Sequence, residues 1–112
     1  RVVFKLMANT YVNAKVDLTT TSATTLYTCA ASTTAIVKSI IVSEDSGNAD
    51  TITLTITSGS DVFSLFKTKA VSANNTLELL SAPLIVQAEE ILKVTAATAN
   101  RLHVVASILE VT

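Results

Sequence analysis

The stretch that decides the fold is Asp50-Thr51-Ile52-Thr53-Leu54-Thr55-Ile56-Thr57, in which branched apolar residues alternate with threonine. Successive side chains of a β-strand point to opposite faces of the sheet, so every second residue shares a face. Ile52, Leu54 and Ile56 therefore occupy one face, and the threonines occupy the other. β-branched residues also favour extended backbone. The stretch predicts a β-strand with one buried face.

Similar runs recur along the 112 residues, and clusters of Asn, Asp, Ser and Gly separate them about every ten residues. This spacing is typical of a sandwich or a barrel. Residues 78–86 are rich enough in Leu and Ala to suggest a helix, but Pro83 interrupts them, so we expect two short strands around a bend. We predict one all-β domain over residues 1–112, an antiparallel β-sandwich, for which a jelly roll is one available topology. The expected strands cover residues 2–6, 10–18, 23–29, 34–43, 50–57, 61–69, 75–80, 84–87, 90–96 and 102–111.

The same alternation predicts which side chains are buried between the two sheets. The expected core residues are Ile52, Leu54, Ile56, Leu77, Leu79, Leu92, Val94, Leu102 and Val104.

The last expected strand is apolar on both faces. Its first face carries Leu102, Val104, Ala106 and Ile108, and its second face carries Val105, Leu109 and Val111. A strand of this kind is either central in a packing of two sheets or pressed against another subunit. Both alternatives remain open from the sequence.

The first nine residues form a candidate arm, because Val2, Phe4 and Leu6 alternate with Val3 and Lys5. We expect the arm to add to a sheet edge, either its own or that of a neighbouring subunit. Met7 is an alternative natural start, and residues 1–6 are then either an upstream extension or the result of processing, two alternatives that the sequence leaves open. The candidate interface residues are Val2, Phe4, Leu6, Val105, Leu109 and Val111.

The composition favours assembly over catalysis. Hydrophobic residues make up 49% of the chain and charged residues 15%, so we expect apolar surface to face a neighbouring subunit in a homo-oligomer. The net charge is −1 and the basic residues are scattered, which argues against nucleic-acid binding. No apolar run is long enough to span a bilayer, so we expect no membrane partner.

The reactive side chains are few. Cys29 and His103 are the single residues of their kinds, and we expect Cys29 to be a small buried apolar residue. One histidine cannot build a multi-histidine metal site. Residues 44–50 gather oxygen-bearing side chains around Gly47, for which a hairpin turn is preferred over a calcium loop. We therefore expect no catalytic, cofactor-binding or metal-binding residues, and no enzymatic activity.

A family resemblance emerges from five segments, residues 22–40, 71–80, 84–94, 99–104 and 107–110. Together they resemble the small all-β virion proteins of tailed bacteriophages, including those of cyanophages and other marine phages, over roughly residues 8–112. Such proteins commonly have a Gly-Asp turn before the strand that begins here at Ile91, whereas this chain has Glu89-Glu90, which suggests a different turn type.

The resemblance implies a structural role in the virion, which is assembled in the host cytoplasm. Our first expectation is a capsid decoration or cement protein that binds the major capsid protein as a homo-oligomer, for example a trimer. The alternatives are a neck or tail component, and a carbohydrate-binding β-sandwich used in host attachment. Fold alone does not choose among these roles.

Overall fold

A computed structural model describes residues 8–112, which form nine strands and no helix. All strand pairs are antiparallel, so the predicted all-β class is confirmed. Each expected strand is present with its ends shifted by at most two residues, except residues 2–6, which lie outside the described part. The strands are β1 (Asn9–Asp17), β2 (Thr24–Thr28), β3 (Thr34–Glu44), β4 (Asp50–Ser58), β5 (Asp61–Val71), β6 (Thr76–Glu78), β7 (Leu84–Val86), β8 (Ile91–Ala96) and β9 (Leu102–Val111).

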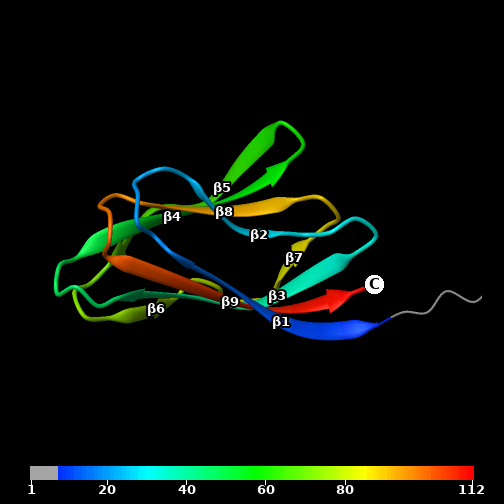
Figure 1. Ribbon diagram of the computed structural model, residues 1–112, viewed down its shortest axis with the longest axis horizontal. Helices are drawn as coiled ribbons and strands as arrows, with labels where there is room; N and C mark the ends of the chain where they lie inside the picture. The colour runs from blue at the N-terminus through cyan, green and yellow to red at the C-terminus, as the bar shows by residue number, and fades with distance from the viewer. Residues whose placement is uncertain (1–7) are drawn as a thin grey trace, which may run out of the picture.

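Two sheets pack face to face, as Figure 1 shows. The first sheet has the order β1-β9-β3-β6, with β7 also pairing with β3, and the second has the order β2-β8-β4-β5. The pairing is nested, because β1 pairs with β9, β2 with β8, β3 with β6 and β7, and β4 with β5. One long hairpin rolled over two sheets produces this order, which is the jelly-roll topology.

The outer edge of β3 explains why β6 and β7 are separate strands. β7 pairs with Ala35–Val37 and β6 with Ile41–Ser43, and β3 has a bulge between these two stretches. The Glu78 carboxylate accepts hydrogen bonds from the backbone N–H groups of Ile40 (2.8 Å) and Leu80 (3.1 Å). Glu78 thus connects the bulge in β3 with the residues that follow β6. The separate pairings of β6 and β7 confirm the predicted pair of short strands on either side of Pro83.

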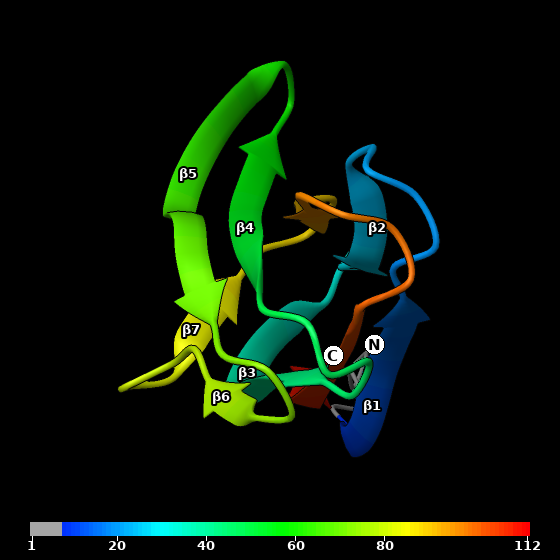
Figure 2. The same ribbon diagram turned by 90° about the vertical axis from the view of Figure 1, so that its left-hand side faces the viewer.

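The core lies between the sheets and contains most of the predicted residues. Ile52, Leu54, Leu92, Val94, Leu102 and Val104 are completely buried, and Leu79 is 6% exposed. The other two, Ile56 and Leu77, are partly buried and pack against this core. Ile56 lies toward the tip of the β4–β5 hairpin, which projects from the body in Figures 1 and 2, and Leu77 belongs to the short edge strand β6.

Candidate assembly interface

Strand β9 lies between β1 and β3 and has two different faces. The inner residues Leu102, Val104, Ala106 and Ile108 are at most 1% exposed. The outer residues are more accessible, since Val105 is 39% exposed and Leu109 and Val111 are half-buried. β9 is therefore a central strand of the first sheet, which was one of the two alternatives that the sequence left open. The contact of the outer face with another subunit stays a prediction.

The outer face of the first sheet carries an apolar row that crosses four strands. Tyr11 of β1 pairs with Leu109 of β9, Leu109 pairs with Ile36 of β3, and Ile36 pairs with Ile85 of β7. Tyr11 is 76% exposed and Ile85 is 49% exposed, so the two ends of the row are the most accessible. Cross-strand partners on one face lie in direct reach of one another. These four residues, which we call the apolar row, therefore form one continuous surface.

A second, mixed row runs parallel to the apolar row on the same face. It joins Lys15, Val105, Ile41 and Glu78 across β1, β9, β3 and β6. Ile41 is 38% exposed, close to the value for Val105. Asn13 and Ser107 pair between the two rows and separate them with polar side chains. The outer face thus has one row that is entirely apolar. The mixed row has two apolar residues in the middle, with the basic Lys15 at one end and the acidic Glu78 at the other.

The structure brings together half of the predicted interface residues. Val105, Leu109 and Val111 share the outer face, whereas Val2, Phe4 and Leu6 lie outside the described residues. The sequence prediction missed Tyr11, Ile36, Ile41 and Ile85. Ile36 and Ile41 alternate with buried neighbours in β3, but only the strand order places the four residues beside Val105 and Leu109.

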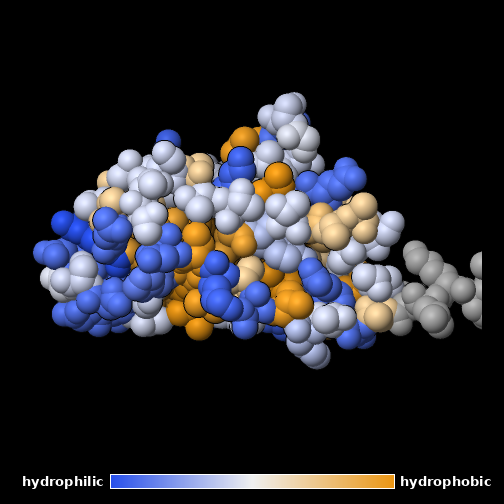
Figure 3. Space-filling view, in the orientation of Figure 1, coloured by the Kyte–Doolittle hydropathy of each residue, from blue (hydrophilic) through white to orange (hydrophobic). Residues whose placement is uncertain are grey.

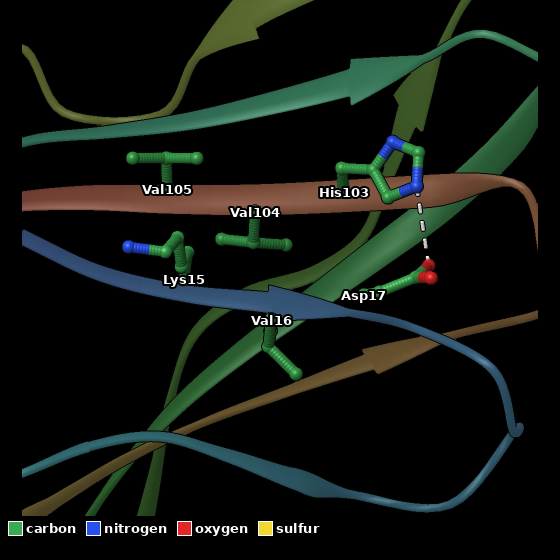
Figure 4. Close-up of a pocket in the computed structure, with 6 residues that line it drawn as sticks. All are labelled: Lys15, Val16, Asp17, His103, Val104 and Val105. Atoms are coloured by element: carbon green, nitrogen blue, oxygen red, sulfur yellow. Dashed lines mark ion pairs between the residues drawn. The ribbon is translucent and has the colours of Figure 1, made fainter.

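A shallow hollow of about 280 Å³ lies between β1 and β9, next to the mixed row. It is lined by Lys15, Val16, Asp17, His103, Val104 and Val105, which Figure 4 displays. His103 Nε2 lies 3.2 Å from Asp17 Oδ1, and His103 Nδ1 lies 3.6 Å from Asp45 Oδ2. These three side chains are each at least 43% exposed. The histidine therefore links the end of β1 to the β3–β4 loop at the surface, in contact with solvent.

The oxygen-rich loop after β3 is organised around one buried carboxylate. Glu44 is 2% exposed and accepts hydrogen bonds from the N–H groups of Ser46 (2.9 Å), Gly47 (3.1 Å) and Asn74 (3.0 Å), and from the Ser46 hydroxyl. These bonds, led by that from the Ser46 hydroxyl, lower the pKa of Glu44 to about 2. Gly47 has a φ of +82°, a conformation that suits glycine. The carboxylate is thus used to hold the β3–β4 and β5–β6 turns together.

Cys29 is buried, as predicted. It is 1% exposed, and its Sγ donates to the carbonyl oxygen of Thr33 at 3.3 Å. Burial raises the pKa of its thiol above the ordinary value, which disfavours the reactive thiolate. Its backbone carbonyl accepts from Glu89, whose φ of +70° is unusual for a residue other than glycine. The Glu89-Glu90 pair therefore forms a turn held against β2.

Residues 8–112 contain no group of three or more His, Cys, Asp or Glu side chains placed to hold a metal ion. In the same part of the chain, no helix is long and apolar enough to cross a membrane. Comparison with protein-family models and with curated proteins found no match to this sequence.

Proposed function

We propose that this protein is a non-enzymatic structural subunit of a phage virion, and that it assembles through the outer face of the first sheet. The apolar row, which crosses four strands and ends in the exposed Tyr11 and Ile85, carries this proposal. A contiguous exposed apolar surface favours association, and aromatic residues are enriched in protein–protein interfaces. The resemblance of residues 8–112 to small virion proteins supports the same role.

The two outer faces of the sandwich differ in polarity, so one of them is better suited to a protein partner than the other. The outer face of the second sheet presents threonines, with Thr53 of β4 paired with Thr95 of β8 and Thr55 paired with Lys93. Such a face suits solvent, whereas the apolar row suits a protein partner. Glycan binding commonly uses aromatic side chains as platforms, and the central strands β4 and β8 of this sheet carry none. The contrast favours an assembly role over carbohydrate binding.

Within the virion, we favour a capsid decoration or cement protein bound to the major capsid protein as a homo-oligomer. A subunit that binds only the assembled shell stabilises the shell by mass action. A neck or tail component is the alternative, because it uses the same kind of contact surface. The two roles differ in the number of copies that each particle requires.

The copy number in purified particles tests the position directly. Quantitative mass spectrometry against the major capsid protein is expected to find on the order of hundreds of copies for a decoration protein. About six to twelve copies would support the neck or tail alternative. Light scattering on the isolated protein at micromolar concentration is expected to show more than one chain per particle. A monomer that also fails to bind particles would overturn the proposed function.

A further inference from the structure

The edge strand β5 has two halves with different surface properties. Its second half carries Lys67, Thr68 and Lys69, and its pairing with β4 is interrupted by two bulges around Leu54. Thr68 also has a positive φ of 53°. Lysines and bulges on an edge strand hinder pairing with other chains. The second half of β5 is thus protected against addition of another strand.

The first half of β5 has none of these protections. Asp61, Val62, Phe63 and Ser64 pair regularly with β4, and the order of the sheet leaves the other side of β5 open. Val62 is 62% exposed, Phe63 is 54% exposed and the neighbouring Leu65 is 38% exposed. Figure 2 shows that this hairpin extends beyond the rest of the sandwich, and Figure 3 shows hydrophobic atoms on it. An exposed apolar edge of this kind is a site for adding a strand.

The other edges of the two sheets fit this role less well. β6 and β7 have three residues each, and β2 has five residues with a register shift after Thr25. β1 is long, but its outer face has a single exposed apolar side chain, Tyr11, among the polar or charged Asn9, Asn13, Lys15 and Asp17. Among the described edges, β5 therefore combines length with exposed apolar side chains.

We propose that residues 1–7 of one copy add as a strand to the first half of β5 in a second copy. This inference rests on the proposed assembly function and names one contact that builds the assembly. The segment reads Arg-Val-Val-Phe-Lys-Leu-Met and alternates Val2, Phe4 and Leu6 with Arg1, Val3 and Lys5. One face of the added strand is then apolar, beside Phe63, and the other carries the basic residues. Asp61, at the start of β5 on the Phe63 face, is the single charged residue within 58–66, and its sign is opposite to that of Arg1 and Lys5.

Residues 1–7 are too short to pair with the β5 edge of their own chain. Ala8 is fixed beside Thr112, since Thr112 N donates to Ala8 O at 3.0 Å. β1 and β5 lie at opposite edges of the two sheets, which places them about 17 Å apart for strand spacings of about 4.8 Å and a sheet separation of about 10 Å. Pairing five residues along β5 requires about 17 Å more, whereas seven extended residues span at most about 25 Å. The β5 edge of another copy has no such restriction.

Disulfide trapping between full-length variants tests the proposal. Val3→Cys is made in one preparation and Ser64→Cys in another, because Ser64 lies on the face of β5 opposite to Phe63 and Val3 lies on the corresponding face of the added strand. The native Cys29 is 1% exposed and does not compete. After mild oxidation of an equal mixture, we expect a dimer whose disulfide joins residues 3 and 64. It should form at least about tenfold faster than with Asn48→Cys, an exposed control in the loop at the other end of β4.

Charge reversal and a double variant sharpen the test. Asp61→Lys in the Ser64→Cys partner should slow cross-linking several-fold, whereas Asp45→Lys, in the loop after β3, should leave the rate unchanged. The double variant Val3→Cys/Ser64→Cys should form chains of cross-linked copies, and a cyclised monomer would overturn the assignment to a neighbour. If the wild-type protein is oligomeric but the 3–64 cross-link forms no faster than the control, this inference is wrong and the proposed function stands. A monomeric wild type that neither cross-links nor binds particles would overturn both.

Discussion

Tyr27 of β2 donates a hydrogen bond to Glu110 of β9, with the phenol Oη 2.5 Å from the carboxylate Oε2. The two residues belong to different sheets and are 83 positions apart in the chain. Tyr27 is 9% exposed, so this hydrogen bond links the two sheets at the border of an otherwise apolar core. Burial, together with the hydrogen bond and negative charge of Glu110, raises the pKa of Tyr27 above its ordinary value.

Replacing Tyr27 by Phe removes this link between the sheets while it keeps the ring. We expect the free energy of unfolding to fall by about 1–2 kcal/mol at neutral pH, since the bond involves a charged acceptor. Because the folded-state pKa is raised, the stabilisation is fully present below the unfolded pKa of about 10 and is lost as the pH rises above it. Urea unfolding at a series of pH values measures both effects. A variant with wild-type stability from neutral to alkaline pH would contradict this role.

The Glu44 carboxylate should make the fold sensitive to acid. Its folded-state pKa of about 2 lies below the ordinary value of 4.5, so its stabilisation is present above pH 4.5 and is lost as the pH falls toward 2. Glu44→Gln should lower the stability at neutral pH and flatten the decrease between pH 4.5 and 2. Thermal unfolding over this range checks the prediction, with Asp45→Asn as the neighbouring control. Parallel pH profiles for Glu44→Gln and the wild type would argue against it.

The register of the core strands is tested by truncation at Leu54 and Val104, both fully buried. Leu54→Ala should cost about 2–5 kcal/mol of unfolding free energy, and Val104→Ala somewhat less, because each leaves a cavity between the sheets. Thr51→Ala, on the half-buried outer face of β4, should cost about 1 kcal/mol or less. Chemical denaturation measures all three. Costs below about 0.5 kcal/mol for both core variants would refute the proposed packing.

The apolar row is tested by Tyr11→Ser and Ile85→Ser, since both side chains are largely exposed. We expect each variant to unfold within about 1 kcal/mol of the wild type, as surface substitutions usually do. Each should weaken self-association or particle binding by about tenfold or more, because apolar contact area is lost. Analytical ultracentrifugation measures the association. Asn13→Ser, on the polar line between the two rows, is the matched control, and an equal effect at Asn13 would show that the row is not the contact.

The sequence by itself determined the strands. The alternation from Asp50 to Thr57 specifies the faces of β4, and Pro83 specifies the break between β6 and β7, because side-chain direction and proline geometry are local properties of the chain. The same local pattern identified the inner and outer faces of β9. It also indicated that Cys29 is buried.

The tertiary structure alone decided which strands are neighbours. Tyr11, Ile36, Ile85 and Leu109 form one row only because β1, β9, β3 and β7 pair in that order and register. Each strand is compatible by itself with several partners, so pairing depends on long-range packing that no single segment encodes. For the same reason, the sequence did not separate the partly buried Ile56 from the fully buried Leu54. Alternation assigns both residues to the inner face, but it does not show how much of that face the opposite sheet covers. How far an inner-face side chain is buried depends on both sheets, because the opposite sheet must cover it.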